Sequence, residues 1–282
     1  MSAIQSLKRR IESITKTASI TKAMHRIAAS KLNSTQNMLE SYQYFKTELE
    51  KVLLDVSHHI KDQQFLEAKP TNKRLFILIT SDRGLAGSYH QQLFNAFLEQ
   101  TKHLNQEDII ILVIGKKGFF WAKKNNYQLI NQEAISNRDQ LSVVSYANHA
   151  NYVEELFIQS KIKDITLVYN HFINALKQEV KFETLLPVNI SENLMNQTDA
   201  LEFMYEGAPD KIFEDLIAIY LQSRIYGVMV DAKLSEFAAR IVAMKQATDN
   251  SNEVLRKLNL QYHQARQQKI TADLLDIVNG KV

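Results

Sequence analysis

The positions of glycine and proline constrain this chain more than any other feature of its sequence. Residues 1–69 contain neither residue type, and residues 210–279 contain no proline and a single glycine, Gly227. All three prolines lie between positions 70 and 209. Because glycine and proline cost about 1 and 3 kcal/mol in a helix interior, both terminal segments are permissive for very long helices.

Apolar side chains recur at alternating steps of three and four residues in both terminal segments, which is the spacing of a coiled-coil seam. The C-terminal seam consists of Leu234, Phe237, Ile241, Met244, Thr248, Ser251, Leu255, Leu258, Tyr262 and Ala265. The N-terminal seam begins with Ile4, Leu7, Ile11, Ile14 and Ala18. Because Thr21 and His25 interrupt it, we expect it to shift to Ile20, Met24 and Ile27. It resumes at Leu49, Leu53, Val56 and Ile60.

Length decides what such helices can do. Sixty helical residues span about 90 Å, whereas a compact globule of this chain length has a radius of gyration of about 19 Å. Each helix therefore needs a partner for its seam outside a globule, and the simplest partner is the other helix. The sequence predicts an N-terminal helix in residues 1–69, a middle domain in 70–209 and a C-terminal helix in 210–282, with the two helices paired antiparallel.

The middle domain has the pattern of an α/β fold. Continuous apolar runs predict strands that are covered on both faces at residues 75–79, 109–114 and 165–169. Helical segments are expected at residues 89–104, 116–124 and 146–161, and an edge strand at 182–188. Strands that alternate with helices indicate parallel βαβ units, so we predict a Rossmann-like domain.

Two glycine-containing turns could hold an anion. Ser81–Ser88 lies between a predicted strand and a helix, but it matches neither the Walker pattern nor Gly-x-Gly-x-x-Gly. Gly115–Gly118 also follows a strand and contains two lysines. We favour structural turns at both places, with glycine supplying special backbone angles. The absence of cysteine excludes thiolate metal sites and cysteine nucleophiles. Apart from the adjacent His58 and His59, which point in different directions on a helix, the histidines are dispersed.

The charge distribution is uneven but does not favour nucleic acid. Residues 1–35 carry seven basic side chains and one acid, Glu12, so this end could steer toward an acidic partner. A coiled coil that binds nucleic acid predicts a basic excess on both long helices, yet residues 231–282 carry eight basic and six acidic side chains. No leader peptide is expected, and the longest aliphatic run, 109–114, is far shorter than the about 20 residues of a spanning helix.

Three stretches together resemble one family. Ile20–Met24 with Ala28–Lys31 is similar to the N-terminal signature of the gamma subunits of F-type ATP synthases, and Ser81–Gly87 resembles their middle-domain turn. The C-terminal resemblance is the longest. It comprises Ser235–Arg240, Ala243–Asp249 and Tyr262–Gln267 with Ile270 and Thr271. The resemblance implies a bacterial-type central rotor that couples ion flow to ATP synthesis and hydrolysis, is not catalytic itself and needs no cofactor or metal.

The resemblance also implies partners and contact residues. The expected partners are the alpha and beta subunits, the epsilon subunit and the membrane ion-carrying ring, at the cytoplasmic face of the bacterial membrane. The positions that match contacts with beta and the catalytic head are Arg266, Gln267, Arg240, Met24, Lys8, Arg9 and Arg10. Tyr205 and Glu206 match the junction near the ion ring.

One other function class remains open from the residues alone. An independent α/β enzyme could use the terminal helices as arms for oligomerisation. Such an enzyme predicts a nucleotide or metal fingerprint in the middle domain, and the sequence contains none. Nothing in the sequence distinguishes protons from sodium ions as the coupling ion, or shows the direction of turnover or regulation by epsilon.

Overall fold

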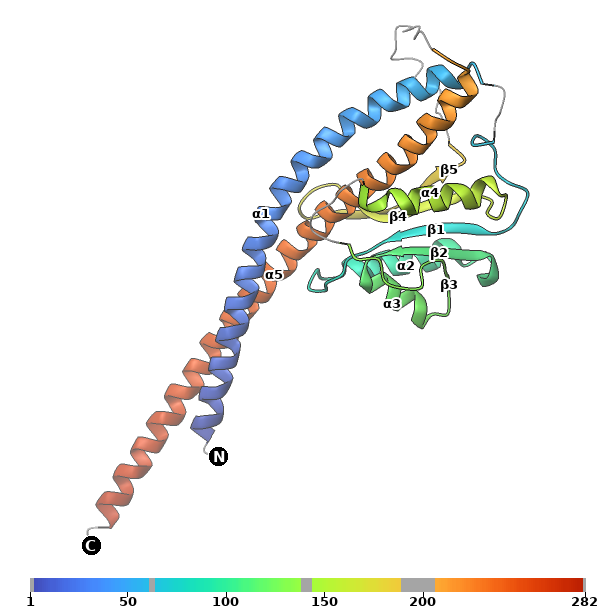
Figure 1. Cartoon of the computed structure of the whole chain (residues 1–282). Coiled ribbons are helices and arrows are strands. Elements are labelled where there is room, and N and C mark those ends of the chain that lie inside the picture. Colours follow the sequence, from blue (N-terminus) through green and yellow to red (C-terminus); the bar gives the residue numbers. More distant parts are fainter. Residues whose placement is uncertain (1–2, 61–63, 138–143, 189–205, 281–282) are drawn as a thin grey trace. The chain divides into compact units, whose positions relative to one another are not determined.

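The chain is described by a computed structural model that covers residues 3–60, 64–137, 144–188 and 206–280 (Figure 1). It divides into two compact units, which we treat separately. The helical unit consists of Met1–Ser30 and Arg240–Val282, and the sheet unit consists of Lys31–Ala239. The boundaries predicted at positions 70 and 209 separate types of element and stay a prediction.

Two long helices contribute to both units. Helix α1 comprises Ala3–Ser57 and helix α5 comprises Pro209–Asn279. Proline is well suited to the first position of α5, because the amide that it lacks would have no helical partner there. The prediction of long N- and C-terminal helices is thus confirmed.

The two helices run antiparallel in each unit. In the helical unit the Thr21 and Thr248 hydroxyl oxygens are 2.7 Å apart. In the sheet unit the Tyr42 ring packs on Gly227. From Thr21 to Tyr42 is 21 positions forward along α1, and from Thr248 to Gly227 is 21 positions back along α5. One antiparallel register therefore holds in both units.

The C-terminal seam is confirmed in the helical unit. Met244 and Leu258 are buried, whereas Thr248, Ser251, Leu255, Tyr262 and Ala265 are half-buried. The intervening residues are exposed except for Ala247. One face of α5 is therefore covered there, as a two-helix pair requires.

The expected shift of the N-terminal seam is wrong. Ile20 and Ile27 are 60% and 55% exposed, whereas Thr21 and Ala28 are 8% and 1% exposed. The alternating step of three and four residues continues without a break, because the Thr21 hydroxyl meets a hydroxyl of the partner helix. A polar residue that finds its partner can occupy a seam.

The sheet unit contains a five-stranded sheet in the order β3-β2-β1-β4-β5. The strands are β1 (Arg74–Ile79), β2 (Ile109–Ile114), β3 (Gln128–Leu129), β4 (Ile165–Phe172) and β5 (Gln178–Leu186). The first four strands are parallel, and β5 pairs antiparallel with β4. The predicted strands are confirmed, although the edge strand begins four residues earlier, and the two-residue β3 was not predicted.

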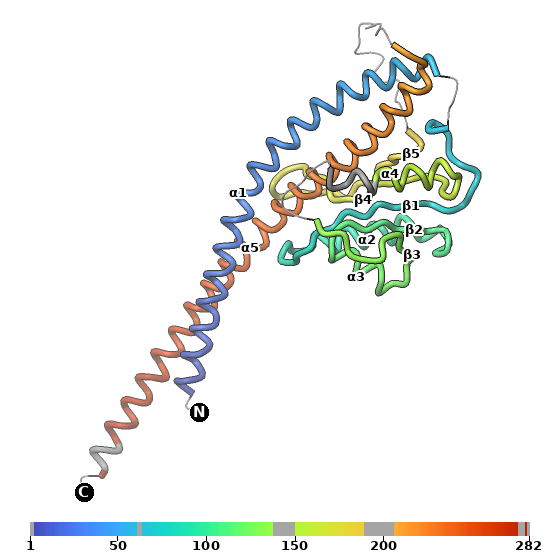
Figure 2. The backbone as a smooth tube through the Cα atoms, viewed as in Figure 1, coloured from blue at the N-terminus to red at the C-terminus, as the bar shows by residue number. Residues whose placement is uncertain are grey.

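Helices cover both faces of this sheet (Figure 2). They are α2 (Tyr89–Thr101), α3 (Lys116–Lys124) and α4 (Val144–Ile158), with a short 3₁₀ turn η1 (Gln106–Asp108). Helices α2 and α3 lie on one face, and α4 lies on the other with the sheet-unit parts of α1 and α5. The result is the three-layer α/β arrangement that the sequence predicts.

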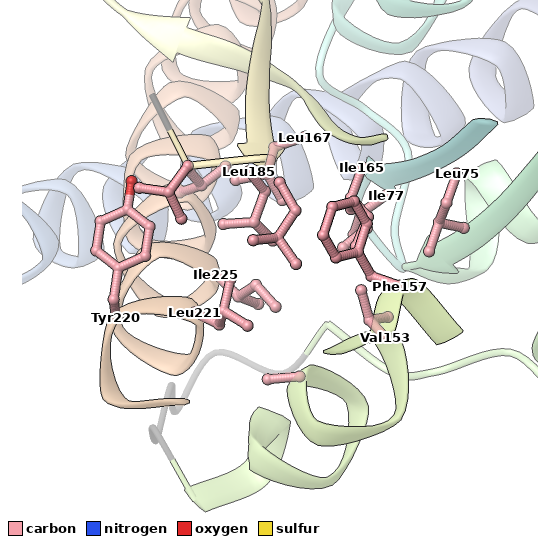
Figure 3. Close-up of a cluster of buried hydrophobic side chains, with 14 of the residues drawn as sticks. Leu75, Ile77, Val153, Phe157, Ile165, Leu167, Leu185, Tyr220, Leu221 and Ile225 are labelled. Atoms are coloured by element: carbon pink, nitrogen blue, oxygen red, sulfur yellow. The ribbon is translucent and has the colours of Figure 1, made fainter. Parts of the chain in front are cut away.

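The core on the α4 side fixes α5 against the sheet. Successive strand residues point to opposite faces, so Leu75 and Ile77 belong to this core, whereas Phe76 and Leu78 belong to the core under α2 and α3. Figure 3 shows side chains of β1, β4, α4 and α5 converging in one cluster. Its α5 members include Leu221 and Ile225, each 1% exposed.

Candidate functional site

The exposed end of the helical unit carries the residues for which the sequence predicts contacts with beta. In the register above, Arg266 is level with Ala3, the first residue of α1. Arg266 and Gln267 are both exposed. From 267 to 279 helix α5 continues beyond the start of α1. Its apolar side chains Ile270, Leu274 and Leu275 are 47%, 57% and 55% exposed.

The remaining predicted contacts fall into two groups. Lys8, Arg9 and Arg10 are exposed, next to the half-buried seam residue Leu7. These three basic side chains thus form a positive surface at the same end of the helical unit as Arg266. Met24 is half-buried, and Arg240 is 5% exposed, so little of the Arg240 side chain is available for contact with another protein.

The predicted ion-ring junction precedes α5. Glu206 is exposed, and Gly207 follows it with a φ of +124°, in the region that favours glycine. Tyr205 lies outside the described residues.

The candidate anion site at Gly115–Gly118, the N-terminus of α3, is filled by the chain itself. The amide of Lys116 donates to Asp82 Oδ1 over 3.1 Å, and the amide of Gly118 donates to Thr80 Oγ1 over 2.9 Å. The amide of Lys117 donates to the Ser81 carbonyl over 3.0 Å. A helix N-terminus attracts an anion through such amides, and here the Asp82 carboxylate takes that place.

Asp82 is held by several donors. Ser136 Oγ donates to its Oδ2 over 2.6 Å, and the amide of Asn137 donates to its Oδ1 over 3.1 Å. Burial raises the pKa of Asp82, but these hydrogen bonds, that from Lys116 and the nearby Lys233 charge together lower it below its usual value. The carboxylate therefore stabilises the fold in its charged form.

Close packing explains the glycine of the second turn. Gly115 has a φ of +100°, and a Cβ there would lie 2.4 Å from the Thr80 carbonyl oxygen. The turn at Ser81–Ser88 is likewise closed internally, with Ser81 Oγ donating to the Arg83 carbonyl over 2.6 Å. Both turns have structural roles that sequence reasoning favoured.

Sequence reasoning missed a buried polar cluster between α1, α5 and β5. Arg224, which is 6% exposed, donates to the Tyr42 hydroxyl over 3.0 Å and forms an ion pair with Glu183. A Cβ on Gly227 would lie 1.9 Å from the Tyr42 ring. The available signal was Gly227, since a lone glycine inside a long helix indicates a close approach.

No helix in the described part of the chain is long and apolar enough to cross a membrane. Nor do three or more His, Cys, Asp or Glu side chains gather there in a way that could hold a metal ion.

Comparison with solved structures places this architecture among central stalks. A chain of the Tetrahymena thermophila mitochondrial ATP synthase central stalk and c-ring is 26% identical, with a TM-score of 0.60 over 81% of this chain and 99% of that chain. A chain of the Euglena gracilis mitochondrial enzyme has a TM-score of 0.63 at 18% identity, over 99% of this chain and 93% of that chain. The second likeness concerns the fold alone.

Comparison with curated proteins gives the family. The ATP synthase gamma chain of Halothermothrix orenii is 33% identical over 99% of this chain and 98% of its own length. That of Exiguobacterium sibiricum is 34% identical over the same shares. The family model described as ATP synthase matches residues 3–281. The chain therefore belongs to the ATP synthase gamma-chain family.

Proposed function

We propose that this chain is the central rotor of a rotary ATP synthase and is not catalytic itself. Its rotation couples ion flow across a membrane to ATP synthesis or hydrolysis in a head built of alpha and beta subunits. Family membership supports the rotor role. The observation that carries the proposal is the single-helix end of α5, residues 267–279, which extends past α1.

The chemistry of this end suits a turning contact. The exposed apolar side chains Ile270, Leu274 and Leu275 offer a surface without fixed hydrogen-bond partners, which can slide within an apolar collar. Arg266 and Gln267 precede this apolar surface along α5 and offer polar groups that form directional hydrogen bonds. A guanidinium can pair with a beta carboxylate in a charge-assisted bond of about 1.5–3 kcal/mol. Such a contact favours one beta conformation without locking the rotor.

The lower helical surface adds weaker contacts. Lys8, Arg9 and Arg10 would face acidic groups of the head, and their attraction would be screened by salt. Met24 lies between the exposed Ile20 and Ile27, so these three offer an apolar stripe to beta. Arg240 is 5% exposed, so it would add little to the surface that contacts beta.

The other two partners, the ion-carrying ring and the epsilon subunit, would bind near the start of α5. Tyr205 and Glu206 would contact the ion-carrying ring, and the epsilon subunit would bind the same part of the rotor. These contacts would hold the chain at the cytoplasmic face of a bacterial membrane. The complex, and not this chain alone, would be the enzyme.

The test replaces Arg266 and Gln267 by alanine in the reconstituted head. Both side chains are exposed, so the fold of the chain should be unaffected. We expect steady-state ATP hydrolysis and the stability of the complex with alpha and beta to fall. The matched control replaces Arg256 and Gln261, which are exposed on the paired part of α5. Equal turnover and equal complex stability in the two double variants would contradict a special role of the tip.

A further inference from the structure

The sheet has a topological switch point between β1 and β4. From β1 the chain proceeds through α2, β2 and α3 to β3 on one side, and then returns through α4 to β4 on the other. In open α/β sheets, ligands bind in the crevice at the carboxyl ends of the two strands beside such a point. The occupant of this crevice in the present chain is one turn of its own helix α5.

The first anchor of this turn is Asp231. The amide of Phe172, at the end of β4, donates to Asp231 Oδ1 over 2.8 Å. His171 Nδ1 lies 2.6 Å from Asp231 Oδ2. Asp231 itself is 7% exposed. Its carboxylate therefore joins α5 to the carboxyl end of β4.

The second anchor is a backbone carbonyl. The Tyr89 hydroxyl donates to the Ala232 carbonyl over 2.9 Å, although that carbonyl lies in the middle of α5. The Tyr89 carbonyl in turn accepts from Asn170 Nδ2 over 3.3 Å. Tyr89 begins α2, so this path joins α5 to the first helix after β1 and to β4 together.

The third anchor is Lys233. Its ammonium donates to the Asn137 carbonyl over 3.2 Å and lies 2.9 Å from a Glu236 carboxylate oxygen, with both side chains 3% exposed. Asn137 Nδ2 donates to the carbonyl of Thr80, the residue after β1, over 2.6 Å. Lys233 therefore joins α5 to the carboxyl end of β1.

These three anchors fix the position of α5 along its axis, which the apolar core alone cannot do. Apolar contacts between a helix and a sheet are not directional, and a helix that moves by one turn, about 5.4 Å, presents a similar apolar face again. Three directional contacts to both strands of the switch point leave one position along the helix axis and one rotation about it. A joint that carries torque needs that property.

We propose that the ligand crevice of this sheet serves as a socket for α5, and that Asp231, Lys233 and the Tyr89 hydroxyl are the positioning groups that carry torque between sheet and helix. The inference rests on the proposed rotor function. The socket couples whatever turns the sheet unit to the helix that enters the head. A weakened socket lets the helix slip under load while the head still hydrolyses ATP.

The experiment uses the whole ATP synthase in membrane vesicles, energised by ATP. A potential-sensitive dye measures ion pumping for either coupling ion, and phosphate release measures hydrolysis. We expect the double variant Asp231→Asn with Lys233→Met to lower pumping per ATP hydrolysed at least threefold against an opposing membrane potential. Two single variants separate charge from shape. Lys233→Met should also lower pumping per ATP hydrolysed, whereas Lys233→Arg, which keeps the charge, should retain most of the wild-type value. A role limited to folding would lower assembly, and with it both rates in proportion.

Lys257→Met is the matched control, because Lys257 pairs with Glu253 on the exposed face of the same helix. If the double variant fails to assemble, Tyr89→Phe decides, since it removes only the hydroxyl at the Ala232 carbonyl. A wild-type pumping ratio in either assembled variant overturns the socket and leaves the rotor function intact. Hydrolysis without pumping in the wild-type complex overturns the rotor function and the socket with it.

Discussion

The same two helices are packed differently in the two compact units. Over residues 245–268 of the helical unit, α5 is covered only along its seam and at Ala247, and its other side chains are exposed. In the sheet unit every α5 residue from 231 to 238 is buried, including the charged residues Asp231, Lys233 and Glu236. One continuous helix is thus a surface helix in one unit and a core helix in the other.

The two units constrain different numbers of positions in the sequence of α5. A two-helix seam needs apolar residues only at every third or fourth position, so most positions tolerate exchange. A helix that is enclosed on all sides must satisfy every polar group within the protein, because no water can replace a lost partner. The sheet unit should therefore be sensitive to single changes that the helical unit tolerates.

The largest expected difference comes from one substitution made in each unit. Leu234→Ala, at a fully buried side chain, should cost about 2–5 kcal/mol of unfolding free energy. Leu255→Ala, at a half-buried seam position, should cost about 1 kcal/mol. Trp121, the only tryptophan, stacks on Phe94 and reports the urea unfolding of the sheet unit by fluorescence, and far-ultraviolet circular dichroism follows the unfolding of the helical unit. Equal costs would remove the distinction between the units.

Gly227→Ala sharpens the comparison inside the sheet unit. In an exposed helix this change stabilises by about 1 kcal/mol. Here the added Cβ meets the Tyr42 ring, so we expect about 1–3 kcal/mol of destabilisation in the same fluorescence assay. The cost should shrink when Tyr42→Leu is introduced first. A stabilised Gly227→Ala protein would mean that α1 and α5 can move apart at no cost.

Asp82→Asn tests the filled N-terminus of α3 through pH. The pKa of Asp82 is lower in the folded state than in the unfolded state, so its stabilisation is present above the usual carboxyl pKa of about 3.9 and is lost as pH falls through the folded value. At pH 7 the variant should lose about 1–3 kcal/mol. Between pH 5 and 3 the difference in unfolding free energy between the wild type and the Asp82→Asn variant should become smaller. A difference in unfolding free energy that does not change with pH would mean that the charge of the Asp82 carboxylate does not stabilise the fold.

The smallest stability effect is expected at Ile20. Because this side chain is 60% exposed, Ile20→Gln should change the unfolding free energy, followed by far-ultraviolet circular dichroism, by less than about 0.5 kcal/mol. Thr21→Gln, one residue further, should destabilise the helical pair measurably, since Thr21 is 8% exposed. The reverse order would restore the seam shift that the sequence suggested.

The sequence predicted those elements whose signal is local. Strand β2 and helix α3 have the predicted bounds, because an apolar run and a glycine-bounded segment are visible without partners. The seam error at Ile20 arose because hydrophobicity alone cannot show that Thr21 meets Thr248 across the pair. Asp231 and Lys233 were missed for a similar reason. Charged residues on a helix are normally exposed, and only the folded sheet brings their partners to them.

The Thr21–Thr248 hydroxyl pair determines how far the end of α5 protrudes beyond α1. If α5 slid by one heptad, Thr21 would face Ile241 or Leu255, and Thr248 would face Ile14 or Ala28, all of them apolar. The pair thus favours one register, as a buried polar residue does in a coiled coil. A slip of one heptad would change the protruding length of α5 by about 10 Å at 1.5 Å per residue. Two hydroxyl groups near the middle of the helical pair therefore set how far the tip reaches, although they lie far from it along the chain.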